Sequence, residues 1–229
     1  MTDVVVHGFQ RSTYVNIVRL VLRHKGIDFR FNDLETQIGS PAHFALHPFG
    51  RVPILEHGDF RIYETSAIVL YIEDTFKNRP LMPSAPKDRA RVHQWISAVN
   101  GYYYPYMIYH LVHERLVFPP LGIAPDEKVV QASIPQINRG LDILERSLEE
   151  TGDHLVGALS LADFFLYPSI YALNLSPEGQ EMLPRRPRVA GWLKRMDDLE
   201  TVRAFRAATP TPVPIEHARA WVDGHRPRY

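Results

Sequence analysis

The chain has 229 residues, of which 45% are hydrophobic, and its 26 basic side chains balance 26 acidic ones. This balance gives no reason to expect nucleic acid or an anionic membrane as a partner, and no apolar run approaches the roughly 20 residues that span a bilayer. Because the chain has no cysteine, disulfides, cysteine-ligated zinc and a catalytic protein thiol are excluded. The N-terminus lacks the basic start and apolar core of a signal peptide, so we expect a cytoplasmic protein.

The N-terminal third has the pattern of mixed α/β structure. The β-branched run 4–6, closed by Gly8, predicts a first strand, and the alternating segment 29–31 predicts a second. Between them, apolar residues at helical spacing predict a helix over 13–25 that ends at Gly26.

A hairpin and another helix follow in this third. The segments 52–55 and 60–63 flank His57-Gly58-Asp59, which is a turn signal, and therefore predict two antiparallel strands. Helical periodicity returns over 66–76.

Prolines mark the boundary between two domains. Three of them between 78 and 86 exclude a helix interior, and beyond them the pattern is helical almost throughout. We predict a first domain over 1–77, a linker over 78–87 and an all-helical domain over 88–229. The helices expected in the second domain are 88–115 (bent at Pro105), 127–151, 160–173 and 189–198.

A Val-Pro step between apolar, β-type residues is unusual, because proline cannot donate a hydrogen bond to a sheet. It is explained if the Val52-Pro53 bond is cis and turns the Val52 backbone toward a cleft, where a peptide pairs as an added strand. Glu64 and Thr65 stand where the next strand gives way to a helix, a place that favours an anionic group. Together these residues predict a site for a small peptide that carries an amine and a carboxylate.

Ser12 and Thr13 stand between the first strand and the first helix, where a hydroxyl has two possible roles. Either residue can cap the helix by accepting a hydrogen bond from a backbone amide. The same geometry lets a hydroxyl donate to a bound thiolate, which the helix dipole also favours. A serine nucleophile is not expected, because the chain has no Gly-x-Ser-x-Gly elbow and no evident base.

Five tyrosines in the ten residues 101–110 cover all faces of a helix, so the core cannot hold every ring. Pocket lining, core packing and subunit contact are the three roles open to them. His110 and His113 lie one helical turn apart, but no third metal ligand is suggested. A solvated or pocket-lining histidine pair is therefore the expectation, and no metal site is predicted.

Ser160 and Asp163 have the spacing of a capping box at the start of an apolar helix. The serine hydroxyl can accept from the amide at the third helical position, while the aspartate carboxylate accepts from the serine amide. Leu159 and Phe164 can close a hydrophobic staple around this box. We assign the motif to folding of the second domain.

In their order and spacing, these motifs resemble the glutathione transferase family over essentially the whole chain. The resemblance rests on the Ser12 loop, the helix end Lys25-Gly26, His47-Pro48-Phe49-Gly50, Val52-Pro53, Glu64-Thr65-Ser66-Ala67-Ile68, Leu81-Met82-Pro83 and the Ser160-Asp163 box. It implies a thioredoxin-like N-terminal domain of order βαβαββα, an all-helical C-terminal domain, a homodimer, and glutathione as cosubstrate.

The resemblance also implies a role for each site residue. Val52 holds the cysteinyl part of glutathione by backbone pairing before cis-Pro53. Glu64 faces the γ-glutamyl ammonium, and Thr65 binds the neighbouring carboxylate with helix-terminal amides. Ser12 stabilises the thiolate, with Thr13 and Tyr14 as adjacent alternates. The candidate walls of the second-substrate pocket are Tyr102, Tyr106, Tyr109, His110 and His113.

One departure from the family pattern concerns the glycine end of glutathione. Related serine-type sequences place a histidine and a lysine before a Pro-x-x-Phe segment, whereas residues 37–41 contain no cation here. Either Gln37, His43 or Arg51 takes their place, or the affinity for glutathione is weaker. The zeta-like signature is only partly matched, which lowers the expectation of maleylacetoacetate isomerisation.

We expect an enzyme that ionises the thiol of glutathione beside Ser12 and directs it at a small, apolar or aromatic electrophile. Two alternatives stay open: a non-catalytic binding or regulatory protein of the same fold, and a zeta-like isomerase. The intact Val52-Pro53 and Glu64-Thr65 favour glutathione binding, while the missing glycine anchor keeps the non-catalytic alternative open. A reductase that uses a protein thiol is excluded by the absence of cysteine.

Overall fold

The computed structural model describes residues 3–208, which form two compact units. The first contains residues 3–79 with 204–208, and the second contains residues 80–203. The domain limits predicted above, and the roles expected for 1–77 and 88–229, stay predictions. The end of that second predicted domain, 209–229, lies outside the described residues.

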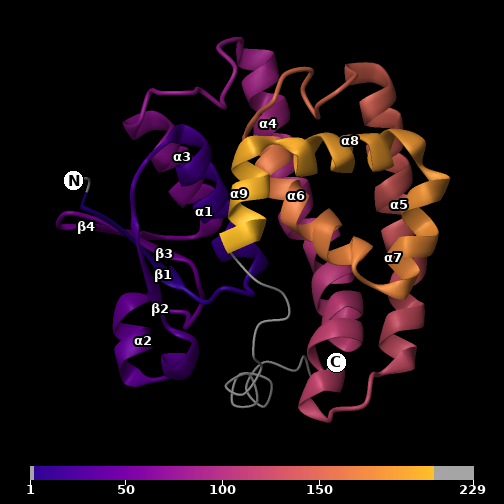
Figure 1. Ribbon diagram of the computed structural model, residues 1–229, viewed down its shortest axis with the longest axis horizontal. Helices are drawn as coiled ribbons and strands as arrows, with labels where there is room; N and C mark the ends of the chain where they lie inside the picture. Colours follow the sequence, from indigo (N-terminus) through magenta and orange to yellow (C-terminus); the bar gives the residue numbers. More distant parts are fainter. Residues whose placement is uncertain (1–2, 209–229) are drawn as a thin grey trace. The chain divides into compact units, whose positions relative to one another are not determined.

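The first unit is built on a four-stranded sheet of order β2-β1-β3-β4 (Figure 1). Its strands are β1 (Val4–Gly8), β2 (Arg30–Asp33), β3 (Ile54–His57) and β4 (Phe60–Tyr63). β1 pairs parallel with β2 and antiparallel with β3, and β3 pairs antiparallel with β4. The strand predicted over 52–55 begins two residues later, after Pro53, which has no N–H for the ladder. The strand predicted over 29–31 also begins later than predicted, at Arg30, and ends at Asp33.

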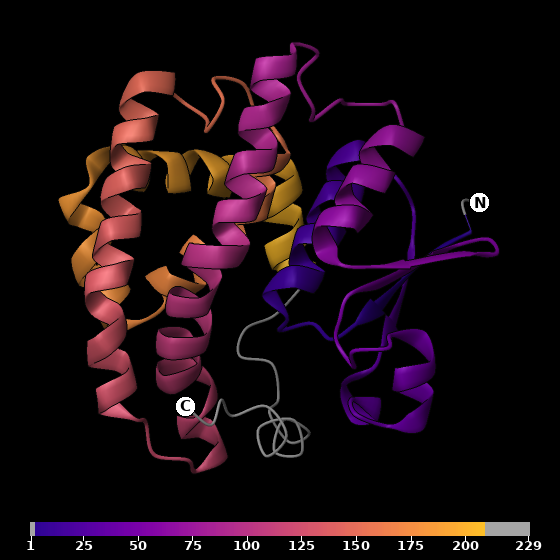
Figure 2. The same ribbon diagram turned by 180° about the vertical axis from the view of Figure 1, so that it is seen from behind.

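Two helices pack against each other in this unit, α1 (Thr13–Lys25) and α3 (Thr65–Thr75) (Figures 1 and 2). α1 has the predicted bounds, and Gly26 ends it in the left-handed region with φ 70°. The helix α2 (Pro41–Leu46) lies between β2 and β3, where the order βαβαββα places a second helix, although no bounds were predicted for it. The short helix η1 (Glu35–Gln37) was not predicted. In both views α2 lies apart from α1 and α3.

A buried ion pair joins α1 to α3. The Nζ atom of Lys25 lies 2.7 Å from Oε2 of Glu73, and the two side chains are 0% and 9% exposed. The ammonium also donates to the carbonyl of Arg79 at 3.4 Å. Each charge is therefore removed from water and neutralised by its partner.

We expect Glu73→Ala to lower the free energy of unfolding by about 3 to 5 kcal/mol, because it leaves the Lys25 ammonium buried without its counter-charge. Urea denaturation measures the change. Asp74→Ala, at the exposed neighbouring position, is the matched control and should stay within about 0.5 kcal/mol. The double variant Lys25→Met, Glu73→Leu should recover most of the loss. A double variant as unstable as Glu73→Ala would contradict the assignment to an uncompensated charge.

The second unit is helical. Its main helices are α4 (Pro86–Ala98), α5 (Glu127–Thr151), α6 (Leu161–Asn174), α7 (Pro177–Met182) and α8 (Pro187–Asp198), with the short turns η4 (Pro119–Leu121) and η5 (Leu183–Arg185). The helix α9 (Glu200–Ala208) follows, and its last residues belong to the first unit.

The helix predicted over 88–115 is divided in the structure. After α4, two π-helical segments follow, η2 (Val99–Tyr103) and η3 (Pro105–Val117). At their junction the N–H of Tyr104 donates to the carbonyl of Val99, five residues earlier. Pro105 has no N–H, and its ring would crowd a carbonyl four residues back, so the wider turn suits this position.

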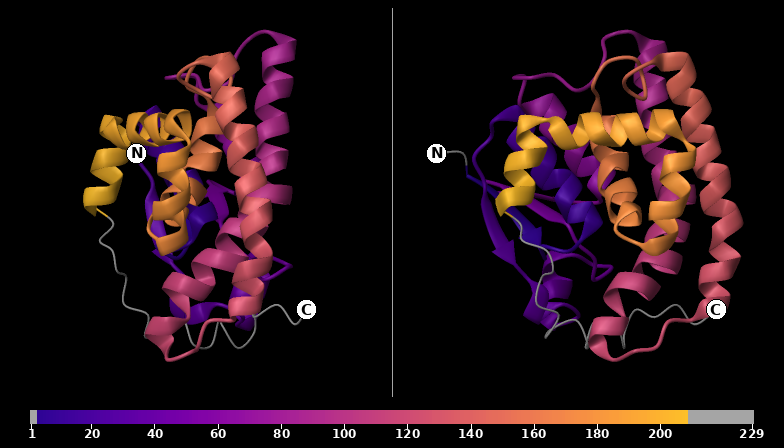
Figure 3. Two further views of the ribbon diagram at one scale, coloured as in Figure 1. Left: turned by 90° about the vertical axis from the view of Figure 1, so that its right-hand side faces the viewer. Right: turned by 45° about the vertical axis from the view of Figure 1, so that its right-hand side comes forward.

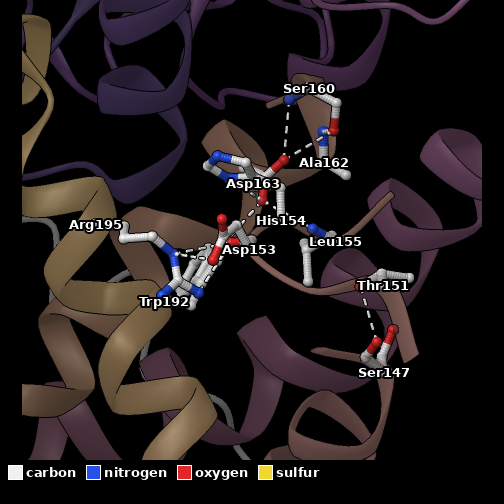
Figure 4. A network of polar contacts seen from close by, with 10 residues as sticks. All are labelled: Ser147, Thr151, Asp153, His154, Leu155, Ser160, Ala162, Asp163, Trp192 and Arg195. Carbon is white, nitrogen blue, oxygen red and sulfur yellow. Dashed lines mark hydrogen bonds and ion pairs between the residues drawn. The ribbon is translucent and has the colours of Figure 1, made fainter. Parts of the chain in front are cut away.

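α6 is the central helix of the second unit and contacts α4, η2, η3, α7 and α8. It is buried on nearly every face, as expected for a helix that is apolar all round. α5 packs along η3 and runs in the opposite direction (Figures 2 and 3). The predicted capping box at Ser160 and Asp163 is confirmed at the start of α6 (Figure 4).

Candidate functional site

The candidate site lies at one edge of the sheet in the first unit. β1 and β4 are each antiparallel to β3, so both end at the edge where β3 begins. The register pairs His7 with Ile54 and Ile54 with Tyr63. The Ser12 loop follows β1, Pro53 precedes β3, and Glu64 follows β4. Three segments that are distant in sequence therefore meet at the same edge.

Ser12 is the N-cap residue of α1. Its Oγ accepts a hydrogen bond from the N–H of Val15 at 3.3 Å, and the side chain is half-buried. Among residues 3–208, the hydroxyl proton of Ser12 has no acceptor. Capping uses a lone pair of Oγ, whereas donation uses the proton, so the two roles considered for Ser12 are compatible.

The electrostatics of α1 favour an anion beside Ser12. The first turn of the helix contains no acidic side chain, and the last turn carries Arg23, His24 and Lys25. The partial positive charge of the helix N-terminus is therefore not neutralised by the helix itself. Of the two alternates, Thr13 is buried and Tyr14 is half-buried.

The Val52-Pro53 bond is cis, as predicted. Within the described part of the chain, neither the N–H nor the carbonyl of Val52 has a hydrogen-bond partner. The preceding residue is held firmly: Nε2 of His43 donates to the carbonyl of Arg51 at 3.0 Å, and Nδ1 of His43 accepts from the N–H of Gly39 at 3.1 Å. His43 is fully buried, and both of its ring nitrogens are used inside the fold.

Glu64 has a backbone conformation that is rare for a residue with a side chain. Its φ is 72° and its ψ is 115°, and it occupies the N-cap position of α3 without a capping bond from its side chain. The carboxylate is exposed, whereas Thr65 is buried. Non-glycine residues held at positive φ concentrate at functional sites, because the surrounding fold must impose the conformation.

Two of the three candidates for the glycine end of glutathione are exposed, Gln37 in η1 and Arg51 before β3. The third, His43, is the buried residue described above. Close by, burial lowers the pKa of His47, and the neighbouring His43 and Arg51 act in the same direction. The His47 ring therefore stays neutral at pH 7 and packs on Tyr63 with 4.5 Å between ring centroids.

The Ser12 loop is held by contacts that the sequence did not indicate. The N–H of Ser12 donates to the carbonyl of Phe9 at 3.2 Å, and Arg11 forms an ion pair with Glu35 in η1. The side-chain Nδ2 of Asn16 donates to the carbonyl of Gln10 at 3.0 Å. The only sequence signal for the role of Asn16 is that it is a polar residue near the start of α1. No sequence signal indicates the ion pair of Arg11, because its partner Glu35 is remote in the chain.

The tyrosine-rich run of the second unit is divided among different environments. Tyr102 is 71% exposed, whereas Tyr103 and Tyr104 are buried. The hydroxyl of Tyr103 donates to the carbonyl of Gly140 in α5 at 2.9 Å, and burial raises its pKa. Core packing is thus the role of Tyr103, while Tyr102 faces outward.

The four remaining candidate walls form two edge-to-face ring pairs on η3. Tyr106 lies 5.4 Å from His110, and Tyr109 lies 5.3 Å from His113, between ring centroids. All four are half-buried, and burial lowers the pKa of His110. Imidazole rings paired with phenol rings make a surface of mixed apolar and polar character.

Two further properties bear on function. Within residues 3–208, no group of three or more histidine, cysteine, aspartate or glutamate side chains is arranged to hold a metal ion. None of the helices described for this chain is long and apolar enough to cross a membrane.

Comparison with known proteins agrees with this architecture. The family model "Glutathione S-transferase, N-terminal domain" matches residues 6–80, and "Glutathione S-transferase, C-terminal domain" matches residues 127–195. Glutathione S-transferase 3 of Zea mays is 30% identical over 222 residues, which cover 93% of this chain and 98% of that protein. This chain belongs to the glutathione S-transferase family. As a glutathione S-transferase it is an enzyme.

Other relatives extend the comparison. Glutathione S-transferase F14 of Arabidopsis thaliana is 32% identical over 184 residues, covering 76% of this chain and 72% of that protein. A solved structure of glutathione S-transferase I, bound with the ligand lactoylglutathione, matches with a TM-score of 0.80 and 25% identity over 90% of this chain and 99% of that one. The predicted fold class, a thioredoxin-like domain followed by a helical domain, is confirmed.

Proposed function

We propose that this transferase binds glutathione along the sheet edge described above and that the hydroxyl of Ser12 donates a hydrogen bond to its thiolate. The observation that carries the proposal is the proton of Ser12, which has no acceptor among the described residues although Oγ caps α1. A donor at an unneutralised helix N-terminus stabilises an anion, and a thiolate is such an anion. The protein has no cysteine, so the reacting sulfur comes from the ligand.

The remaining roles follow from the chemistry of each group. The unpaired backbone of Val52 is suited to two hydrogen bonds with the cysteinyl part of glutathione. The exposed carboxylate of Glu64 is suited to the γ-glutamyl ammonium, and Thr65 with the first amides of α3 to the adjacent carboxylate. We assign the glycine carboxylate to Arg51 and Gln37, because His43 has no ring nitrogen left to offer.

The reaction begins with loss of the thiol proton to solvent. An unperturbed cysteine thiol has a pKa of about 8.5, so only a few per cent is ionised at neutral pH. Donation from Ser12 stabilises the thiolate and lowers that pKa. The sulfur then attacks an electrophilic carbon, forming a carbon–sulfur bond. In a substitution the displaced group leaves with the electron pair of its bond. Binding both reactants side by side adds a proximity contribution.

We propose a small electrophile of apolar or aromatic character, bound against Tyr106, Tyr109, His110 and His113; the exposed Tyr102, the fifth candidate, lies on η2 outside this group. Half-buried rings on η3 support this, since they combine apolar area with polar tips. The related glutathione S-transferase I was solved with lactoylglutathione bound, which supports a glutathione-derived ligand at this site. The homodimer and the cytoplasmic location stay predictions, and so does the zeta-like isomerisation.

The test is a titration with glutathione followed by ultraviolet absorbance of the thiolate as a function of pH. We expect binding below millimolar concentration and a bound-thiol pKa at least about one unit below 8.5, which is a tenfold gain in the ratio of thiolate to thiol. S-methylglutathione, which has no ionisable thiol, should bind without the absorbance change. Absence of binding at millimolar glutathione would contradict the proposal. Binding with an unshifted pKa would contradict the role of Ser12.

A further inference from the structure

The side chain of Asn16 links the Ser12 loop to a buried arginine. Its Nδ2 donates to the carbonyl of Gln10 at 3.0 Å, and its Oδ1 accepts from Nη1 of Arg19 at 3.2 Å. A guanidinium can only donate and a carbonyl can only accept, so the amide has one possible orientation between these two groups. Arg19 therefore determines which end of the Asn16 amide faces the loop.

Arg19 is itself held in place. It is 6% exposed, and its guanidinium carbon lies 4.5 Å from the ring centroid of Phe31 and 4.9 Å from that of Phe205. Both rings belong to the first unit. Burial, with a smaller effect of Arg23, lowers the pKa of Arg19 to about 10, so the guanidinium remains protonated at neutral pH. Cation–π contacts with two aromatic rings restrict the position of the guanidinium and with it the direction of its donors.

The carbonyl that Asn16 holds is at the centre of a turn. The N–H of Ser12 donates to the carbonyl of Phe9, which makes 9–12 a β-turn with Gln10 and Arg11 in the middle. β-turn types differ mainly in the orientation of this central peptide. Rotation of the Gln10 carbonyl changes the path of the chain into Ser12, and with it the direction of the Ser12 hydroxyl.

We propose that Asn16 and Arg19 are positioning residues for Ser12: the clamped guanidinium orients the Asn16 amide, and the amide fixes the turn that aims the hydroxyl at the thiolate. This inference rests on the proposed role of Ser12. Neither residue contacts glutathione in this scheme. Their effect is on the ionisation of the bound thiol, and binding of the peptide portion through Val52 and Glu64 is preserved.

The principal test compares the bound-thiol pKa of the wild type with that of Asn16→Leu, which has a similar volume and no hydrogen-bonding group. We expect the pKa to rise by about one unit, a tenfold loss in the ratio of thiolate to thiol at fixed pH. The dissociation constant of S-methylglutathione should change less than about twofold, because that ligand has no thiol to ionise. If Asn16→Leu does not fold, Asn16→Asp serves instead: it keeps an acceptor for Arg19 and loses the donor to Gln10.

Arg19 has a matched control on the same helix. Arg23 lies one turn along α1, and its guanidinium also stands over Phe205, at 5.8 Å. Arg19→Met should raise the bound-thiol pKa as Asn16→Leu does, whereas Arg23→Met should leave it unchanged. Arg19→Lys keeps a charged donor and should recover part of the shift. Equal shifts for Arg19→Met and Arg23→Met would overturn the proposal, because the effect would then be one of charge alone.

A double-mutant cycle separates positioning from general destabilisation. In the Ser12→Ala background there is no hydroxyl to aim, so Asn16→Leu should produce no further rise in the pKa. Additive shifts would overturn the inference and leave the role of Ser12 intact. A Ser12→Ala variant with an unchanged bound-thiol pKa would overturn both, and the two failures are thereby distinguished.

Discussion

Ser12→Ala is expected to lower kcat/KM for glutathione-dependent conjugation about 100-fold at pH 7, because removal of one preorganised donor from a developing or bound anion typically costs about two to three orders of magnitude in rate. In the wild type the hydroxyl stabilises the thiolate and so lowers the pKa of the bound thiol. Loss of the hydroxyl raises that pKa. The rising limb of the pH–rate profile should therefore move to higher pH, and activity should partly recover above about pH 9.

Three variants separate the hydroxyl from the helix cap and from its neighbours. Ser12→Gly removes the same hydroxyl, yet glycine costs the cap only a few tenths of a kcal/mol, so it should lose as much activity with less loss of stability. Thr13→Val and Tyr14→Phe each remove an alternate hydroxyl and should retain activity within about threefold of wild type. Steady-state kinetics over pH 6 to 10 make the comparison. Wild-type turnover in Ser12→Ala, with a loss in Tyr14→Phe or Thr13→Val, would transfer the role to that residue.

Asp163→Ala is expected to be the most destabilising of the proposed substitutions, lowering the free energy of unfolding by about 4 to 6 kcal/mol. The buried carboxylate of Asp163 accepts two hydrogen bonds from Ser160, from its N–H at 3.0 Å and from its hydroxyl Oγ at 2.9 Å (Figure 4). It also accepts from the N–H of Leu155 at 3.1 Å and from Nε1 of Trp192 at 2.9 Å. Alanine leaves buried donors unpaired at the start of α6, the central helix of its unit. Each unpaired donor costs about 1 to 3 kcal/mol, with partial relief by relaxation.

Chemical denaturation followed by tryptophan fluorescence measures this loss, since Trp192 is one of the donors. Asp153→Ala is the matched control: it lies in the connection between α5 and α6, but its side chain is 75% exposed and pairs with Arg195 near the surface. That control should change stability by no more than about 1 kcal/mol. A loss for Asp163→Ala no larger than the control would show that the box is dispensable for folding of the second unit.

Local signals account for the elements that were predicted with accurate bounds. α1 has a serine cap and a left-handed glycine at its end, and α6 has a capping box, so each carries its own start or stop in sequence. The short helices α2 and α7 begin at Ser-Pro steps, Ser40-Pro41 and Ser176-Pro177, which are also start signals. The bounds of α2, and α7 as a whole, were not predicted, because a six-residue helix has too few apolar positions to show periodicity.

The π-helical segments could not be predicted from periodicity. Apolar spacing over 88–115 indicates a helix, but the choice between hydrogen bonds to the fourth or the fifth preceding residue depends on packing and on local crowding at Pro105. The same applies to Glu64, whose positive φ is imposed by the junction of β4 and α3. A glutamate at position 64 does not by itself indicate a positive φ.

By itself, the sequence determined the family-like order of motifs, the cis Val52-Pro53 step and the need for a sulfur from the ligand, because these depend on residue identity and short spacing. The tertiary structure alone decided that β3 runs antiparallel to β1 and β4, which brings three remote segments to one sheet edge. It also decided that Ser12 caps α1 with its proton still unpaired, and that Arg19 and Asn16 hold the turn before it. Hydrogen bonds are directional over about 3 Å, so a side chain's partner follows from the folded register and cannot be read from its neighbours in the chain.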